Sequence, residues 1–62
     1  MKFNVPTIDS PDAAERLQQV ILTSEPEAKI EIDREAKTVV INSKASEATF
    51  KQLIVAAGHE VN

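Results

Sequence analysis

The feature that most limits the fold of this chain is the order in which the spacing of its apolar residues changes. Polar and apolar residues alternate over residues 2–5 and 28–33, and also over 38–42 except that Val40 occupies a position of the polar set. This period of two is typical of half-buried strands. In two other segments, which begin at Ser10 and Ser46, apolar residues recur every three or four positions, as they do on one face of an amphipathic helix. The pattern therefore predicts the order strand, helix, strand, strand, helix.

Residues that favour helix ends mark the limits of both predicted helices. Ser10 can accept a hydrogen bond from a free amide of the first turn, and Pro11 suits the first helical position. Ser46 is the equivalent cap of the second helix, and Gly58, the only glycine, is expected to end that helix in a left-handed conformation. Residues 59–62 are then long enough for a closing edge strand.

The simplest packing of these elements places both helices on one face of a single sheet. Each predicted helix has one apolar stripe, and each predicted strand has one apolar face. With the closing strand at residues 59–62, the sequence predicts an α+β fold, a ferredoxin-like βαββαβ sandwich with a four-stranded antiparallel sheet. Because many unrelated functions use this fold, the fold alone does not predict a function.

Length and composition limit the function further. The 62 residues are enough for one domain, which we place at residues 1–62, and no apolar run approaches the roughly 18 residues of a membrane span. The chain has no cysteine, so nothing calls for an oxidising compartment, and we expect a cytoplasmic location. Its net charge of -3 repels nucleic-acid phosphates and anionic membranes. We therefore expect neither nucleic acid nor a membrane as a partner.

Three stretches of the sequence are similar to motifs of a known family. They are the loop V-P-T-I-D-S-P-D-A at residues 5–13, the segment D-R-E-A-K-T-V-V-I at residues 33–41 and the ending A-A-G-H-E-V at residues 56–61. With them the chain resembles, over essentially its whole length, the heavy-metal-associated domain family, and in particular small copper chaperones of the cyanobacterial type. That family carries M/I-x-C-x-x-C in the first loop, D-x-x-x-K-x-V in the hairpin and A-G-Y/H-x-V after the second helix. The resemblance implies the same fold and a role in metal trafficking.

The resemblance also locates the largest difference from the family. Matched residue by residue, the two metal-binding cysteines of the family fall on Ser10 and Ala13 of this chain. Cu(I) is a soft ion that this family holds with two thiolates, and neither a hydroxyl nor a methyl group replaces a thiolate. We therefore expect Cu(I) binding to be weak or lost. Because the bridging thiolates are missing as well, we expect a monomer.

His59 is the residue best suited to a remaining metal site. The resemblance implies a histidine near the metal loop at this position, and imidazole is a good ligand for Cu(II), Zn and Ni. Asp9 and Asp12 could add carboxylate oxygens, so the metal site that we predict is a weakly bound borderline ion at His59, Asp9 and Asp12. Each residue also has a simpler interpretation, with His59 as a polar loop residue and the aspartates as ordinary charges at the start of a helix.

Two kinds of function remain open. The first is a non-enzymatic domain of the copper or heavy-metal chaperone type, active in metal transport. The alternative is a metal-independent interaction or regulatory module that docks on a domain of a metal-transport ATPase or on a sister chaperone. Catalysis is not expected, because the chain has a single histidine and no evident pair of acid and base.

A group of acidic residues near the hairpin bears on the second possibility. Such a group could complement a basic partner or simply face the solvent, and the sequence leaves both interpretations open. Its members are Glu25, Glu27, Glu31, Asp33 and Glu35.

Overall fold

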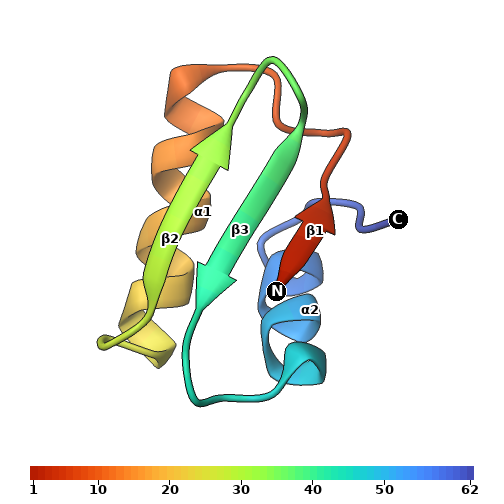
Figure 1. Ribbon diagram of the computed structural model, residues 1–62. Coiled ribbons are helices and arrows are strands. Elements are labelled where there is room, and N and C mark those ends of the chain that lie inside the picture. Colours follow the sequence, from red (N-terminus) through yellow and green to blue (C-terminus); the bar gives the residue numbers. More distant parts are fainter.

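The computed structural model describes residues 1–62 and has the predicted order of strands and helices as far as the second helix (Figure 1). Strand β1 covers Lys2–Asn4, helix α1 Pro11–Ser24, strand β2 Lys29–Asp33, strand β3 Thr38–Asn42 and helix α2 Glu47–Ala56. Neither helix combines the length and the apolar character that a membrane crossing requires.

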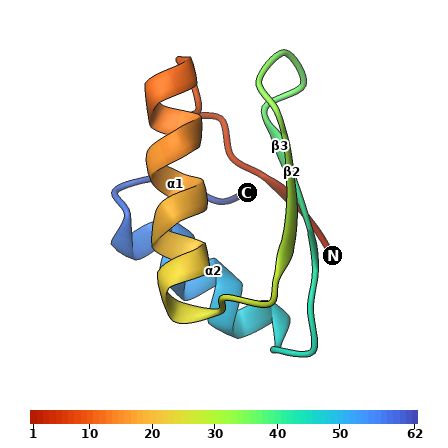
Figure 2. The ribbon, with the colours of Figure 1, turned by 90° about the vertical axis from the view of Figure 1, so that its left-hand side faces the viewer.

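Strand β3 is the centre of an antiparallel sheet with the order β1-β3-β2. Val39 of β3 faces Phe3 of β1 on one side and Ile32 of β2 on the other, so these apolar side chains form a row across the sheet. Because successive residues of a strand point to opposite faces, this register puts the apolar residues of all three strands on one face, except for Val40, which is exposed on the other. Both helices cover that face, and the opposite face is open (Figure 2).

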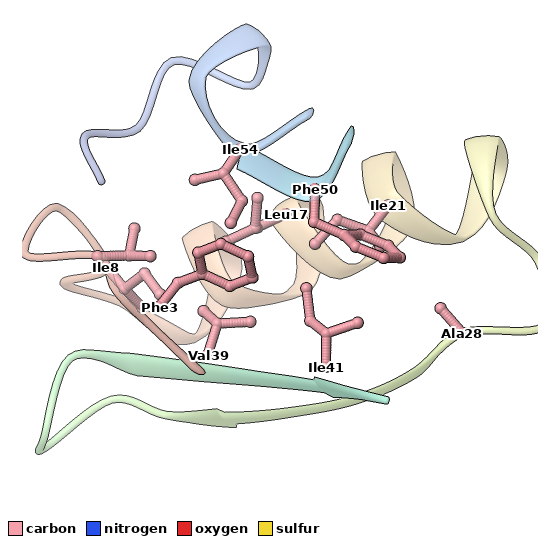
Figure 3. Close-up of a cluster of buried hydrophobic side chains, with 10 residues drawn as sticks. Phe3, Ile8, Leu17, Ile21, Ala28, Val39, Ile41, Phe50 and Ile54 are labelled. Atoms are coloured by element: carbon pink, nitrogen blue, oxygen red, sulfur yellow. The ribbon is translucent and has the colours of Figure 1, made fainter. Parts of the chain in front are cut away.

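The core forms where the two helices meet the covered face of the sheet. Leu17 and Ile21 of α1 and Phe50 and Ile54 of α2 are fully buried, and Figure 3 shows them between the helices and the strands. All buried residues are apolar, and burial of apolar surface is the main force that stabilises a chain this short. The ten buried residues are Phe3, Val5, Ile8, Leu17, Ile21, Ala28, Val39, Ile41, Phe50 and Ile54.

Both helices begin at the serine caps predicted from the sequence. The Ser10 Oγ accepts a hydrogen bond from the Ala13 amide at 3.1 Å, and Pro11 opens α1. The Ser46 Oγ accepts a hydrogen bond from the Thr49 amide at 3.2 Å. These bonds satisfy amides that have no carbonyl partner within the helix, so the caps fix where each helix starts.

The predicted fourth strand at residues 59–62 is wrong, because the sheet has three strands. The end of the chain lies beside β1 (Figure 1), but only one backbone hydrogen bond joins them, from the Asn62 amide to the Asn4 carbonyl at 2.9 Å. The Glu60 amide donates to a threonine side chain instead. Pro6, two residues after Asn4, has no amide hydrogen with which to continue the pairing. The rest of the architecture is the predicted ferredoxin-like one.

Candidate functional site

The β1–α1 loop (residues 5–10) contains several of the residues singled out from the sequence and is held along its length. At its start, the Val5 amide donates to the Lys37 carbonyl at 2.8 Å, next to β3. In its middle, Ile8 is fully buried, and the Ile8 amide donates to the Val5 carbonyl at 3.2 Å. At its end, Ser10 caps α1. The loop is therefore a fixed element of the fold.

Lys37 holds the loop from the hairpin between β2 and β3. Its φ of +58° is a left-handed conformation that is uncommon outside glycine. The Lys37 Nζ donates a hydrogen bond to the Ile8 carbonyl at 2.6 Å, and a bond from a charged donor is stronger than one between neutral groups. The sequence shows Lys37 only as part of the hairpin motif, and no local signal reveals this bond.

The end of α2 positions His59. The amides of Gly58 and His59 donate to the carbonyls of Val55 and Ile54, at 2.9 and 3.2 Å respectively, which is the Schellman arrangement of a helix C-terminus. Gly58 has the left-handed conformation predicted for it, with φ of +90°, and a Cβ atom there would meet nothing within 4 Å. The glycine is therefore required for its backbone angle, which turns the chain back toward the β1–α1 loop.

His59 contacts the loop through Thr7, a residue that the sequence did not single out. The Thr7 Oγ1 lies 2.8 Å from the His59 Nδ1 and accepts a hydrogen bond from the Glu60 amide at 3.1 Å. This hydroxyl therefore joins the loop to the segment after α2. The ring nitrogen that faces away from this contact is Nε2. For Nε2 to bind a metal ion, the neutral ring must carry its hydrogen on Nδ1 and donate it to Thr7.

The two positions that match the family's cysteines lie at the start of α1. Ser10 and Ala13 are both half-buried, and the Ser10 Oγ accepts the hydrogen bond that caps the helix. The hydroxyl therefore has a structural role, and the methyl group of Ala13 has no metal-binding chemistry. Ala13 and His59 line the same open groove, which has a volume of about 500 Å³ and also borders Ala57. The histidine thus lies on the side of α1 where the second cysteine would be.

The two aspartates of the predicted metal site do not line that groove. Asp9 is exposed and borders a separate, larger depression together with Lys37. Asp12 is exposed in the first turn of α1, where a negative charge stabilises the helix. No three histidine, aspartate or glutamate side chains are grouped so that they could hold a metal ion. The fold therefore brings His59 to the groove beside Ala13 without gathering a closed set of ligands.

The sheet order, the two helices on one face and the loop that leads into α1 define a heavy-metal-associated domain, as solved structures show. Copper chaperone Atx1 from Synechocystis PCC6803 is similar to this chain, with a TM-score of 0.94 and 31% identity over 100% of this chain and 98% of that one. The cyanobacterial copper metallochaperone ScAtx1 is similar with a TM-score of 0.82 and 31% identity, over 100% and 97% of the two chains. The chain belongs to the family of Atx1-type copper chaperones, which confirms the resemblance found in the sequence.

Three further comparisons do not add evidence for the family. A gold binding protein has a TM-score of 0.91 at 19% identity, over 100% of this chain and 98% of that one, and so shares the fold alone. No family model matches the sequence, and no curated protein sequence matches it. The family assignment therefore rests on the solved copper chaperones, in which identity and coverage of the whole chain occur together.

Replacing Thr7 by valine removes the hydroxyl and keeps the shape of the side chain, so it tests the link between the loop and His59. We expect the free energy of unfolding, measured by urea denaturation, to fall by about 1 kcal/mol. The NMR shifts of the His59 ring and the Glu60 amide should change as well. Thr23→Val is the matched control, because the Thr23 hydroxyl donates only within its own exposed helix turn, to the Gln19 carbonyl. Equal effects of the two substitutions would contradict a special role for Thr7.

Proposed function

We propose that this chain is a docking domain of the copper-trafficking class that does not itself carry Cu(I). In the family that it resembles, two thiolates hold Cu(I), and the matching positions here are Ser10 and Ala13. The observation that carries the proposal is the use of the Ser10 hydroxyl as a helix cap beside the methyl group of Ala13. Neither group is a useful ligand for a soft ion.

A fixed loop without thiolate ligands supports a role in recognition. Ile8 anchors the loop in the core, Lys37 donates to its carbonyl, and Thr7 contacts His59. A surface that is already ordered loses less conformational freedom when a partner binds. We propose that this role is non-enzymatic and cytoplasmic. Ser10 and His59 have separate hydrogen-bond partners, so they are not arranged as a nucleophile and its base.

The partner that we propose is a related domain of a metal-transport ATPase, or a sister chaperone. Charged side chains near the loop support such docking, because Asp9 borders the same depression as Asp33 and Glu35 of the hairpin. All three are exposed. Lys2, Arg34 and Lys37 border the same depression, so it carries charges of both signs. A partner with the complementary arrangement of charges would be steered to this surface and oriented on it.

A weak site for a borderline ion is the second candidate function. The position of His59 on the groove beside Ala13 favours it, with Nε2 as the nitrogen ligand. We propose that Asp9 or Asp12 would supply an oxygen ligand, and water the remaining ones, for Cu(II), Zn or Ni. Such an ion would be held by few protein groups and would exchange readily.

Restoring cysteines at positions 10 and 13 tests the loss of Cu(I) binding. We expect the unmodified chain to leave Cu(I) with a competing chromogenic chelator. The combined Ser10→Cys and Ala13→Cys variant should take up Cu(I) stoichiometrically, because two thiolates are the ligands that this ion prefers. Each single variant is a control with one thiolate. Stoichiometric Cu(I) binding by the unmodified chain would contradict the proposal.

His59→Ala tests the second candidate. With Zn, Ni or Cu(II) added separately, we expect saturable changes of NMR signals at His59 and in the β1–α1 loop. The variant should lose these changes, because it lacks the only imidazole ligand. Glu27→Gln is the control, since it removes a carboxylate from the exposed turn after α1, away from the loop. The absence of any saturable change would eliminate the borderline site and leave the docking function.

Capture of the chain by an isolated metal-transport ATPase domain tests docking. We expect capture to persist in the presence of a metal chelator. Combined Asp9→Lys and Glu35→Lys should weaken binding by about tenfold at low salt, because both side chains border the proposed docking surface. Combined Glu25→Lys and Glu27→Lys makes the same change of charge at the other end of α1 and should leave binding nearly unchanged. Capture that disappears when the chelator is added would show that a metal ion is needed.

A further inference from the structure

Strand β2 is an edge of the sheet and is paired only with β3. Its side chains alternate between exposed and half-buried, so Ile30 and Ile32 are only half-buried although they lie on the covered face. Helix α1 runs alongside β2 in the helix layer and not in the plane of the sheet (Figures 1 and 2), and no strand pairs with the outer side of β2. An open edge with partly uncovered apolar side chains is a template for pairing with another strand.

The hydrogen bonds of β3 decide which backbone groups of β2 are free. The Ile41 amide donates to the Met1 carbonyl at 2.8 Å, on the β1 side of the sheet. Because the direction of these bonds alternates along an antiparallel strand, the neighbouring residues Val40 and Asn42 turn their groups toward β2. Their partners there are Glu31 and Lys29. The backbone groups of β2 that face away from β3 therefore belong to the residues that alternate with Lys29 and Glu31 along the strand.

Those outward-facing residues are Ile30 and Ile32, together with Ala28 just before the strand. Ile30 and Ile32 each present an amide and a carbonyl to the open edge. Ala28 presents its carbonyl alone, because its amide donates to the Glu25 carbonyl at 3.1 Å. A second strand can form hydrogen bonds with β2 only if its own free groups face these residues.

Charge decides between the registers in which two copies of β2 could pair antiparallel. With Ile32 at the centre, Glu31 would face Asp33 of the other copy twice. With Glu31 at the centre, two Lys29–Asp33 contacts would form, but Glu31 would face itself. With Ile30 at the centre, Lys29 faces Glu31 of the other copy twice. Asp33 then lies opposite Glu27, which is in the exposed turn before β2 and not in the strand. The Lys29–Glu31 pairs are of the non-hydrogen-bonded type, in which side chains lie closest together.

We propose that two copies of this chain associate through β2, antiparallel and centred on Ile30, into one continuous sheet. In this register Ile30 of each copy bonds reciprocally with Ile30 of the other. The Ile32 amide donates to the Ala28 carbonyl of the other copy, so the free backbone groups of Ala28 and Ile30 all have partners. The Ile32 carbonyl alone lacks one, because the Ala28 amide opposite it already donates to Glu25. The half-buried isoleucines of both copies then cover one another. This surface contains neither Ser10 nor His59, so the association is independent of the metal chemistry of the loop. It therefore differs from the thiolate-bridged association whose loss led us to expect a monomer from the sequence.

Sedimentation of the unmodified chain from micromolar to millimolar concentrations tests the proposal. We expect a monomer–dimer equilibrium. Lys29→Glu and Glu31→Lys should each raise its dissociation constant about tenfold or more, because two attractive pairs become repulsive. The combined variant exchanges the two charges and should restore association. An equal mixture of the two single variants should form mixed dimers. Lys51→Glu on the exposed face of α2 is the control for net charge and should change little.

Two outcomes would overturn the proposal. One is a single monomeric species for the unmodified chain at all concentrations. The other is association that the changes at Lys29 and Glu31 do not affect, which would place the contact elsewhere. An NMR contact between the Hα atoms of Lys29 and Glu31 of different copies would support the register centred on Ile30. A contact between Lys29 and Asp33 of different copies would contradict it.

Discussion

The β1–α1 loop keeps its shape because Ile8 is buried, which is unusual for a residue in a connection on the protein surface. Burial of a side chain of this size is worth roughly 1.5–3 kcal/mol, and the backbone carbonyl of the same residue is held by Lys37. Because Ile8 is fixed in the core, the positions of Thr7 and Ser10 on either side of it are restricted as well. Thr7 can meet His59, and Ser10 can cap α1, because the residue between them cannot leave the core.

In many small metal-binding domains the bound ion contributes to the stability of the fold. In this chain, apolar burial and hydrogen bonds within the protein stabilise the loop instead. The chain has no cysteine, so neither thiol oxidation nor competition for Cu(I) can alter its loop by that route. In the docking function that we propose, the partner would meet the same surface whether copper is scarce or abundant. The amount of complex formed with the partner would then depend on the concentration of this domain and not on the concentration of copper.

The sequence predicted those parts of the structure that depend on neighbours along the chain, and missed those that depend on contacts in space. Local periodicity was enough for both helices and the hairpin, and the backbone preference of glycine was enough for Gly58. The closing strand failed because residues 59–62 make only one backbone hydrogen bond with β1, and the Glu60 amide donates to the Thr7 side chain instead. Thr7 and Lys37 were missed because their roles appear only once the chain is folded. The position of His59 beside the loop came from the resemblance and not from any local pattern.

The contacts that complete the loop are among the most distant along the chain, since Thr7 meets residues 52 and 53 positions away. Contacts across such separations must overcome the entropy of closing a long loop, and they tend to form after the local ones. During synthesis the β2–β3 hairpin can therefore form early, whereas the loop acquires its final shape only after His59 has left the ribosome. A partner that binds the finished loop would distinguish a folded chain from one that is still being made.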